Sequence, residues 1–225
     1  MTRKSFAIRH LKLNAPDEDT ARRYILEWHA ADLYHRVGEF PHLTSVELFR
    51  REGPLELEIG CGTGEHLCDL AAERPEVNFV GIDISLKSLH AAVERARGMS
   101  LDNIKFIKAG IQLVYPLLEP GSLGAIYLHF PDPCLRPKYR KRKVWGQAFL
   151  DHAHDALAEG GLLSIMTDVS PLFIEMLARV ERDPRFEKTH AERYLSGPDT
   201  SVKSRYQATW AKYGIYPMRF VVRKK

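Results

Sequence analysis

The stretch Leu55-Glu56-Leu57-Glu58-Ile59-Gly60-Cys61-Gly62-Thr63-Gly64 decides the fold. An apolar strand pattern ends in a carboxylate and runs directly into three glycines at every second position. Glycine adopts φ > 0 without penalty and lets the backbone approach a ligand closely. Residues 65–72 predict a helix whose N-terminal N–H groups face the same crevice. The stretch therefore predicts a strand–loop–helix unit that holds a nucleoside-sized cofactor at the carboxyl edge of a parallel sheet.

The spacing of these glycines points away from a dinucleotide. It is G-x-G-x-G, whereas the dinucleotide fingerprint is G-x-G-x-x-G. Glu58 precedes the first glycine by two residues, and its charge would repel a pyrophosphate but attract a cation. S-adenosylmethionine carries a sulfonium and an ammonium and no phosphate. Residues 79–82 predict a second strand that leads into Asp83, about 20 residues on, where a carboxylate can accept both ribose hydroxyls. We expect this cofactor to contact Glu58, Gly60, Gly62 and Asp83; a glycine-rich turn with a chance acid nearby is the competing interpretation.

Length and composition limit the class of protein. With 225 residues and 44% hydrophobic content, the chain can form one large domain, or one domain with an extension, around a packed core. No apolar run reaches the roughly 18 residues of a membrane span, and no signal peptide is recognisable. Three cysteines make neither a disulfide framework nor a zinc site. We expect a cytoplasmic protein without a metal.

The order of the predicted elements indicates an α/β fold. Strands are predicted at 55–59, 79–82, 104–107, 125–129 and 162–166, and helices at 86–97, 144–158 and 171–180. Ser85 would cap the helix at 86–97, Ser170-Pro171 would cap the helix at 171–180, and Gly160-Gly161 would end the helix at 144–158. Residues 186–192 and 216–222 predict an antiparallel finish at the sheet edge. We expect an N-terminal extension over 1–53, with apolar residues at helical spacing over 20–37, and a doubly wound domain over 54–225.

Positive charge is concentrated in one short segment. The run 136–143 holds six basic residues in eight, which exceeds the formal net charge of +4 of the whole chain. Such a block is typical of a nucleic-acid contact, although a solvated surface loop has the same composition.

Two further carboxylates follow predicted strands. Asp132 stands between two prolines, which hold it in a stiff, extended turn at the edge where ligands bind in open sheets. Asp168 lies two residues after the strand predicted at 162–166. Together with Glu58 and Asp83, these acids suit a cationic cofactor and a base that donates N–H groups, as guanine does at N1 and N2. A plain Pro-Asp-Pro turn and a helix N-cap are the respective alternatives for Asp132 and Asp168. Since the basic run begins four residues after Asp132, a polyanion bound there would lie across the crevice.

The chain resembles the bacterial tRNA (guanine-N7)-methyltransferase family. The resemblance spans about residues 55–220 and rests on the motifs at 57–64, 81–83, 129–133 with the basic run, and 167–168. The glycine loop is generic to methyltransferases, whereas the Phe-Pro-Asp-Pro turn with its basic tail is far more specific. The family implies a Rossmann-like class I methyltransferase fold with a seven-stranded, mostly parallel sheet. It also implies S-adenosylmethionine as donor and N7 of a guanine in the tRNA variable loop as acceptor.

The resemblance also implies roles for single residues. Glu58 and Asp83 would bind the donor, and Asp132 would lie at the reaction centre in contact with it. Asp168 would contact the target guanine, and Arg136 would lie near the substrate, where the family usually has lysine. The tRNA backbone would lie on Lys138, Arg140, Lys141, Arg142 and Lys143.

Three departures from the family concern recognition. Cys134 follows Pro133, where the family has tryptophan. Gly110 stands where an acid commonly lies near the adenine, so backbone N–H groups would serve that edge. The late Thr-x-x-Glu motif corresponds to residues 204–207, which places Ser204 and Gln207 on the guanine side; an alignment on residues 200–203 fits less well.

Three other functions stay open on the sequence alone. They are a methyltransferase acting on another RNA, a small molecule or a protein; a nicotinamide oxidoreductase; and a non-catalytic RNA-binding module. The glycine spacing and Glu58 disfavour the oxidoreductase, and a binding module would not need carboxylates at strand ends. The sequence leaves open which tRNAs are used and whether the protein is a monomer or a homodimer.

Overall fold

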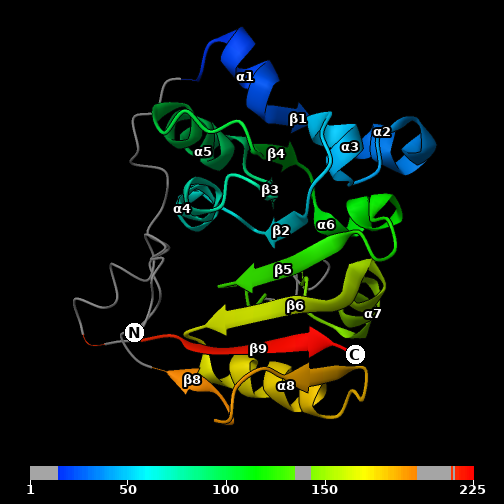
Figure 1. The fold of residues 1–225 in the computed structure, drawn as a ribbon, viewed down its shortest axis with the longest axis vertical. Helices are drawn as coiled ribbons and strands as arrows, with labels where there is room; N and C mark the ends of the chain where they lie inside the picture. Colours follow the sequence, from blue (N-terminus) through cyan, green and yellow to red (C-terminus); the bar gives the residue numbers. More distant parts are fainter. Residues whose placement is uncertain (1–14, 135–142, 197–213, 215) are drawn as a thin grey trace.

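The computed structural model describes residues 15–134, 143–196, 214 and 216–225. A nine-stranded sheet forms the centre of the molecule (Figure 1), with the strand order β1-β4-β3-β2-β5-β6-β9-β7 and with β8 paired to β9. In that order the strands are β1 (Ile25–Glu27), β4 (Ile104–Lys108), β3 (Asn78–Asp83), β2 (Leu55–Ile59), β5 (Leu123–His129), β6 (Leu157–Thr167), β9 (Met218–Lys224), β7 (Phe186–Lys188) and β8 (Leu195–Ser196). The predicted α/β fold with a mostly parallel sheet and an antiparallel C-terminal edge is confirmed. The sheet has two strands more than the expected seven, the short edge strands β1 and β8.

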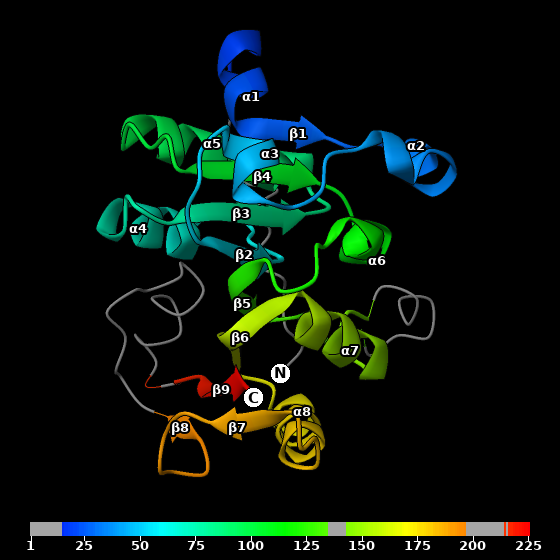
Figure 2. The ribbon, with the colours of Figure 1, turned by 45° about the vertical axis from the view of Figure 1, so that its right-hand side comes forward.

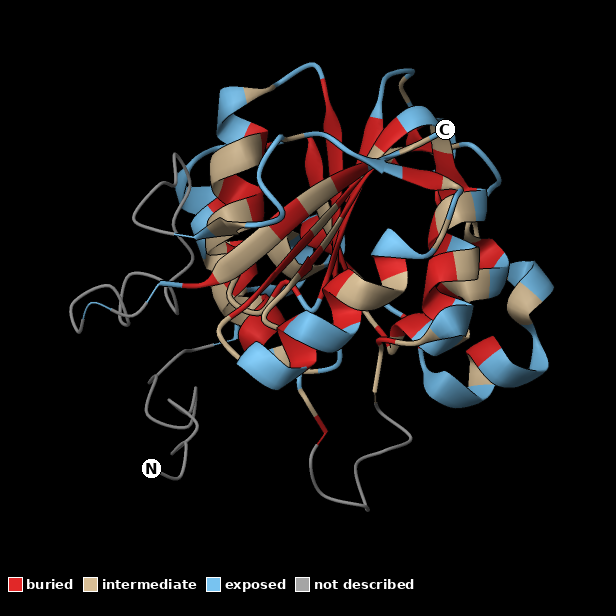
Figure 3. Cartoon of the chain, turned by 90° about the horizontal axis from the view of Figure 1, so that it is seen from below, coloured by how far each residue is buried: buried red, intermediate tan, exposed pale blue. Residues whose placement is uncertain are grey.

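Helices cover both faces of the sheet, as Figure 2 shows. On one face lie α4 (Glu65–Glu73) and α5 (Leu86–Gly98), and on the other lie α6 (Ile111–Val114), α7 (Gln147–Ala156) and α8 (Ser170–Glu181). Buried side chains alternate along the strands between two hydrophobic clusters: Phe79 packs toward α4 and α5, whereas Val80 and Ile82 belong to the other side. Figure 3 shows the buried strands between helices whose outer faces are exposed.

The register of the sheet brings the strand ends together. Glu58 on β2 lies beside Gly81 on β3 and Tyr127 on β5, and all three strands run parallel. Their carboxyl ends therefore open on one edge, which is the binding edge of open α/β sheets. The last strand of the parallel set, β6, pairs with β5 in the same direction, so that His129 lies beside Met166.

The N-terminal part corrects one prediction. The helical spacing over 20–37 does not form one helix: α1 (Glu18–Tyr24) is followed by β1 and then by α2 (Ala30–His35). The interruption arises because Ile25 and Leu26 pair with Phe106 and Ile107 of β4, and tertiary pairing overrides the local pattern. A 3₁₀ turn (Val37–Glu39) and α3 (Ser45–Phe49) complete this part. Its buried residues Trp28, Leu33, Leu43 and Leu48 belong to the main hydrophobic cluster.

The helix boundaries can be compared with the caps and helix ends that the sequence predicts. Ser85 caps α5 by accepting the N–H of Ser88 at 3.3 Å, as predicted. The helix α8 begins at Ser170, one residue before the predicted start, and its N-cap is Val169, whose side chain accepts no capping hydrogen bond. The prediction that Ser170 caps this helix and the alternative that Asp168 caps it are therefore both wrong. The prediction that Gly160-Gly161 ends a helix is also wrong, because α7 ends at Ala156 and β6 begins at Leu157. Gly160 instead lies within β6 with φ +76°, where the register against β5 shifts.

The remaining short element is a 3₁₀ turn (Tyr115–Leu117) before β5. Across the described residues, every helix is too short or too polar to cross a membrane.

Candidate active site

The glycine loop after β2 folds as the sequence predicts. Gly60, Gly62 and Gly64 all have positive φ, at 78°, 57° and 73°. The N–H groups of Gly60 and Cys61 both donate to the carbonyl of Ile82, at 2.7 and 3.1 Å, which ties the loop to the end of β3. A Cβ built on Gly60 or Gly62 meets nothing within 4 Å, so both lie against open space at the strand edge.

Gly64 serves a different purpose from the two glycines before it. A Cβ at Gly64 would lie 2.8 Å from the Cβ of Ala92 on α5, so this glycine allows α4 to pack against α5. The loop thus contains two glycines that keep space for a ligand and one that is required by packing.

Two glutamates of β2 lie in contrasting surroundings. Glu56 is buried and fully paired: Arg74 donates to both its oxygens at 2.8 and 2.7 Å, and the hydroxyl of Tyr127 donates to Oε2 at 2.8 Å. Glu58, with only 4% of its surface exposed, forms no ion pair with a lysine or arginine among the described residues. Among the described residues its Oε2 is buried and accepts no hydrogen bond. Because a buried, unpaired carboxylate oxygen is costly, Glu58 is the group of this edge that fits an incoming cation best.

Asp83 at the end of β3 is held in a fixed orientation. Its Oδ2 accepts the N–H of Gly62 at 3.0 Å, and its Oδ1 accepts the N–H of Ser85 at 2.8 Å. Burial raises the pKa of Asp83 above its usual value, the charge of Glu58 adds to the rise, and the backbone donors oppose it. Each oxygen of a carboxylate can accept a second hydrogen bond, so the pair of oxygens remains able to receive two ligand hydroxyls.

An apolar wall stands next to Asp83. Ile84 has 62% of its surface exposed, which is unusual for a large apolar residue at the end of a buried strand. A Cβ at Gly110, which precedes α6, would lie 3.9 Å from Ile84 Cγ2. Gly110 and Ile84 are therefore neighbours, with Gln112 Oε1 also close, at 3.5 Å from the same Cβ position.

Two histidines that the sequence did not single out lie behind Glu58. His66 comes from the first turn of α4, and its Nδ1 lies 3.3 Å from Glu58 Oε1. Its ring contacts the ring of His129, at the end of β5, with centroids 4.6 Å apart. His129 Nε2 lies 2.9 Å from Ser164 Oγ. Burial, together with His66 and Arg219, holds the pKa of His129 well below its usual value, so this ring is neutral at neutral pH.

The turn after β5 has an unusual backbone. Phe130 and Cys134 have φ of 50° and 49°, which non-glycine residues rarely adopt. The N–H of Phe130 donates to the carbonyl of Met166 at 2.7 Å, and Oδ1 of Asp132 accepts the N–H of Cys134 at 2.8 Å. Asp132 is exposed. These bonds and the two prolines hold its carboxylate outward at the strand edge; such strained turns are common at functional sites.

The structure describes only some of the other residues that the sequence places at the substrate. Asp168 is half-buried directly after β6, at the same sheet edge. Lys143 donates to the two carboxylate oxygens of Glu175 at 3.0 and 3.2 Å. The other predicted contacts lie outside the described residues: Arg136, Lys138, Arg140, Arg142, Lys141, Ser204 and Gln207.

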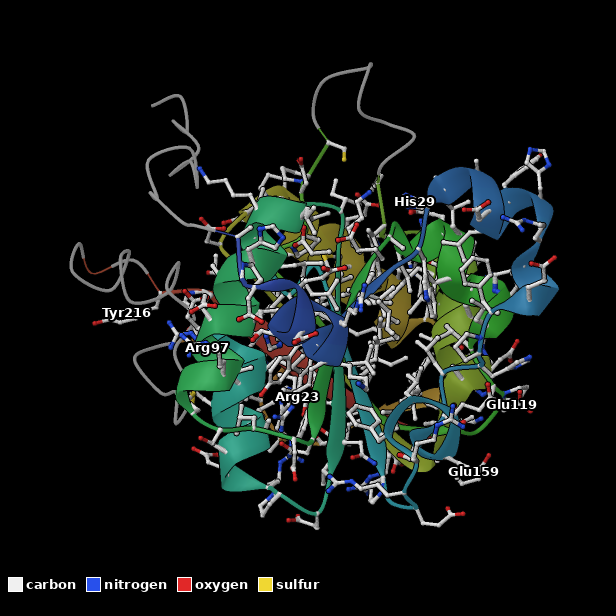
Figure 4. All side chains as sticks on the ribbon, turned by 90° about the horizontal axis from the view of Figure 1, so that it is seen from above. Arg23, His29, Arg97, Glu119, Glu159 and Tyr216 are labelled. Carbon is white, nitrogen blue, oxygen red and sulfur yellow. The ribbon has the colours of Figure 1, made fainter. Side chains whose placement is uncertain are left out.

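Other charged side chains, and a surface cavity, lie away from the acidic edge of the sheet. Figure 4 shows the labelled side chains of Arg97, Glu119 and Glu159 at the periphery of the fold, far from the sheet centre. A surface cavity of about 580 Å³ lies between α7 and α8 and is lined by Gln147, Glu175, Ala178, Arg179, Arg182, Asp183, Pro184 and Arg185. None of the strand-end carboxylates lines it, so the acidic edge remains the candidate site.

The comparisons with known proteins agree on one family. A family model described as "Putative methyltransferase" matches residues 52–216. A curated protein of Rubrobacter xylanophilus, named tRNA (guanine-N(7)-)-methyltransferase, is 48% identical over 98% of this chain and 98% of its own length. The chain belongs to the tRNA (guanine-N(7)-)-methyltransferase family. A relative with the same name from Chloroherpeton thalassium is 34% identical over 96% of this chain and 95% of its own length.

Solved structures agree on the fold of this family member. The crystal structure of TrmN from Thermus thermophilus matches with a TM-score of 0.55 and 22% identity, over 80% of this chain and 47% of that chain. The 30S ribosomal A1408 methyltransferase from an uncultured bacterium matches with a TM-score of 0.54 and 15% identity, over 80% of this chain and 92% of its own. At these identities the likeness concerns the fold alone.

Proposed function

We propose that this chain transfers a methyl group from S-adenosylmethionine to N7 of a guanine in the variable loop of tRNA. The single observation that carries the proposal is the acidic sheet edge, where a buried oxygen of Glu58 has no hydrogen-bond partner among the described residues, in a chain 48% identical to a protein named for this reaction. The three free cysteines, all buried, suit a cytoplasmic protein.

The residues of the edge fit the donor. Glu58 would accept the donor's ammonium, whose positive charge would satisfy the oxygen that lacks a partner within the described chain. Gly60 and Gly62 leave the space that the donor needs, since a side chain there would occupy it. Asp83 would accept the ribose hydroxyls. Gly110 would offer its backbone N–H to the adenine edge, with the exposed Ile84 as the wall on which the ring rests.

The acceptor side is proposed from the turn after β5 and from the end of β6. Asp132 would lie at the reaction centre in contact with the donor, and Asp168 would accept N–H groups of the guanine. Ser204 and Gln207 would complete the recognition of that base. The tRNA backbone would lie on the basic segment that begins four residues after Asp132, through Arg136, Lys138, Arg140, Lys141, Arg142 and Lys143.

For this reaction the protein has to align the two reactants, and it does not have to transfer a proton. S-adenosylmethionine, when bound, supplies an electrophilic methyl group on its sulfonium. Guanine N7 carries a free lone pair at neutral pH, so no residue need act as a general base. The role of Glu58, Asp83 and Asp132 is therefore to hold the two reactants in line at near-attack distance, in surroundings from which most water is excluded. Their negative charges stay close to the positive charge as it moves from sulfur to the purine ring.

The experiment is to map the methylated nucleotide. Bulk tRNA that lacks N7-methylguanosine is incubated with the protein and methyl-labelled S-adenosylmethionine, and the nucleosides are identified by mass spectrometry. We expect label only at N7 of a variable-loop guanine. Asp132→Ala should fold normally, because the side chain is exposed, but should lower the rate about 100-fold or more. Label at another atom, or near-normal turnover by Asp132→Ala, would contradict the proposal or the role of Asp132, respectively.

A further inference from the structure

Three side chains with metal-ligating atoms converge behind the acidic edge. Glu58 ends β2, His66 lies in the first turn of α4, and His129 ends β5. One ligand atom from each residue lies within 4.8 Å of the other two. The sheet register and the packing of α4 bring the three side chains together. No sequence motif predicts that they lie close to one another.

The cluster contains polar atoms without partners. Within the described part of the chain, Glu58 Oε2 and His66 Nδ1 are both buried and form no hydrogen bond. His66 Nδ1 lies 3.3 Å from Glu58 Oε1, but the contact does not have the alignment of a hydrogen bond. Buried polar atoms are nearly always satisfied, so two neighbouring exceptions call for a ligand.

The geometry matches a tetrahedral metal ion. With Zn–N and Zn–O bonds of about 2.0–2.2 Å, two ligands of a tetrahedral ion lie about 3.4 Å apart. The separation of 3.3 Å between Glu58 and His66 agrees with this value, and the widest pair would have to close by about 1.4 Å at most. Ser164 holds the His129 ring through Nε2 at 2.9 Å, the kind of supporting hydrogen bond that orients metal-binding imidazoles.

We propose that Glu58, His66 and His129 bind one Zn²⁺ ion, and that this ion excludes the methyl donor from the site. Two imidazoles and one carboxylate favour Zn²⁺ over Mg²⁺ or Ca²⁺, which prefer all-oxygen ligands. The exclusion rests on the proposed function, in which Glu58 accepts the donor's ammonium. A dication on the same carboxylate would occupy its oxygens and repel the ammonium, so the two cations compete for one group.

The direct test measures Zn²⁺ binding by the full-length protein. Isothermal titration with ZnCl₂ should show one strong site, and Co²⁺ in its place should give the intense visible absorption of a tetrahedral complex. His66→Phe keeps a ring against Tyr127 but removes the ligand, and we expect its affinity for Zn²⁺ to fall about 10–100-fold or more. His129→Asn is a second variant with the same expectation. His35→Gln, which changes an exposed histidine on α2, is the matched control and should bind Zn²⁺ as the unmodified protein does.

The competition test uses S-adenosylhomocysteine, which retains the ammonium of the donor. At about ten times its own Kd, this ligand should raise the apparent Kd of Zn²⁺ about tenfold. His66→Phe should still bind S-adenosylhomocysteine, because His66 is not among the proposed donor contacts.

The outcomes separate the two proposals. If S-adenosylhomocysteine binds but Zn²⁺ does not, or if His66→Phe and His129→Asn both keep full Zn²⁺ affinity, the metal site is refuted and the donor site stands. Equal loss of Zn²⁺ affinity in His35→Gln would likewise refute it. Zn²⁺ binding without any effect of S-adenosylhomocysteine would overturn the exclusion. If Zn²⁺ binds and S-adenosylhomocysteine does not, the assignment of the donor site itself fails.

Discussion

Replacing Gly64 by alanine should destabilise the fold, whereas replacing Gly62 should mainly weaken donor binding. Both residues have positive φ, at 73° and 57°, so each alanine carries a left-handed strain of about 1–2 kcal/mol. Only at Gly64 does the new Cβ collide, at 2.8 Å from the Cβ and 3.2 Å from the Cα of Ala92. Forcing α4 and α5 apart there adds about 1–3 kcal/mol. We therefore expect Gly64→Ala to lose about 2–5 kcal/mol, and Gly62→Ala about 1–2 kcal/mol.

Urea unfolding followed by circular dichroism measures this difference. The entropy that alanine removes from the unfolded chain is common to both variants and cancels between them. S-adenosylhomocysteine titration supplies the second readout: Gly62→Ala should bind more weakly because its methyl group enters the open space of the edge. Equal losses of stability in the two variants, or a Gly64→Ala variant more stable than Gly62→Ala, would contradict the packing role of Gly64.

Three further predictions concern charge. Glu58→Gln should weaken S-adenosylhomocysteine binding about 10–150-fold in calorimetry without loss of stability. Glu56→Gln, which breaks the paired contact with the Arg74 guanidinium, should lower the urea midpoint of unfolding and leave S-adenosylhomocysteine binding unchanged. The reverse pattern would refute the assignment of Glu58 to the donor and of Glu56 to the fold. Since burial raises the pKa of Asp83, its carboxylate becomes protonated at a higher pH than an exposed aspartate, so the affinity for S-adenosylhomocysteine should fall as the pH is lowered from neutral into the acidic range; an affinity that does not change with pH would contradict the role of Asp83. Neutralising residues 140–143 should lower the slope of log K for tRNA against log salt by about 3, and an unchanged slope would exclude this segment as the RNA contact.

Much of the fold was predictable because the parallel strands are short, apolar and separated by amphipathic helices. The glycine loop, the strand ends and the Ser85 cap follow from local chemistry, and the structure confirms them. The edge strand β1 was not predictable in the same way, because residues 25–27 become a strand only by pairing with β4. Gly160-Gly161 has the composition of a helix end but forms an irregularity within β6.

The acidic edge was predictable for a physical reason: carboxyl ends of parallel strands meet at one edge, so acids that follow such strands must lie near one another. What the sequence did not reveal is how their surroundings differ. Glu56 and Glu58 are two residues apart on one strand, yet Arg74 neutralises only Glu56. His129 is the first residue of the motif at 129–133 but received no role there, His66 lies in no motif, and the two rings become neighbours only in the folded chain. A signal for Ile84 did exist, since it is a large apolar residue directly after a strand-end acid.

The proposed function depends first on binding of the methyl donor. Isothermal titration of the purified full-length protein with S-adenosylmethionine, S-adenosylhomocysteine and NAD compares a cationic nucleoside with its demethylated product and with a diphosphate. We predict that the first two ligands bind with a stoichiometry of one and that NAD gives no heat of binding, because the edge is acidic and would repel the pyrophosphate. Binding of NAD, or no binding of either S-adenosyl ligand, would contradict the assignment of these strand-end carboxylates as the site of a positively charged methyl donor.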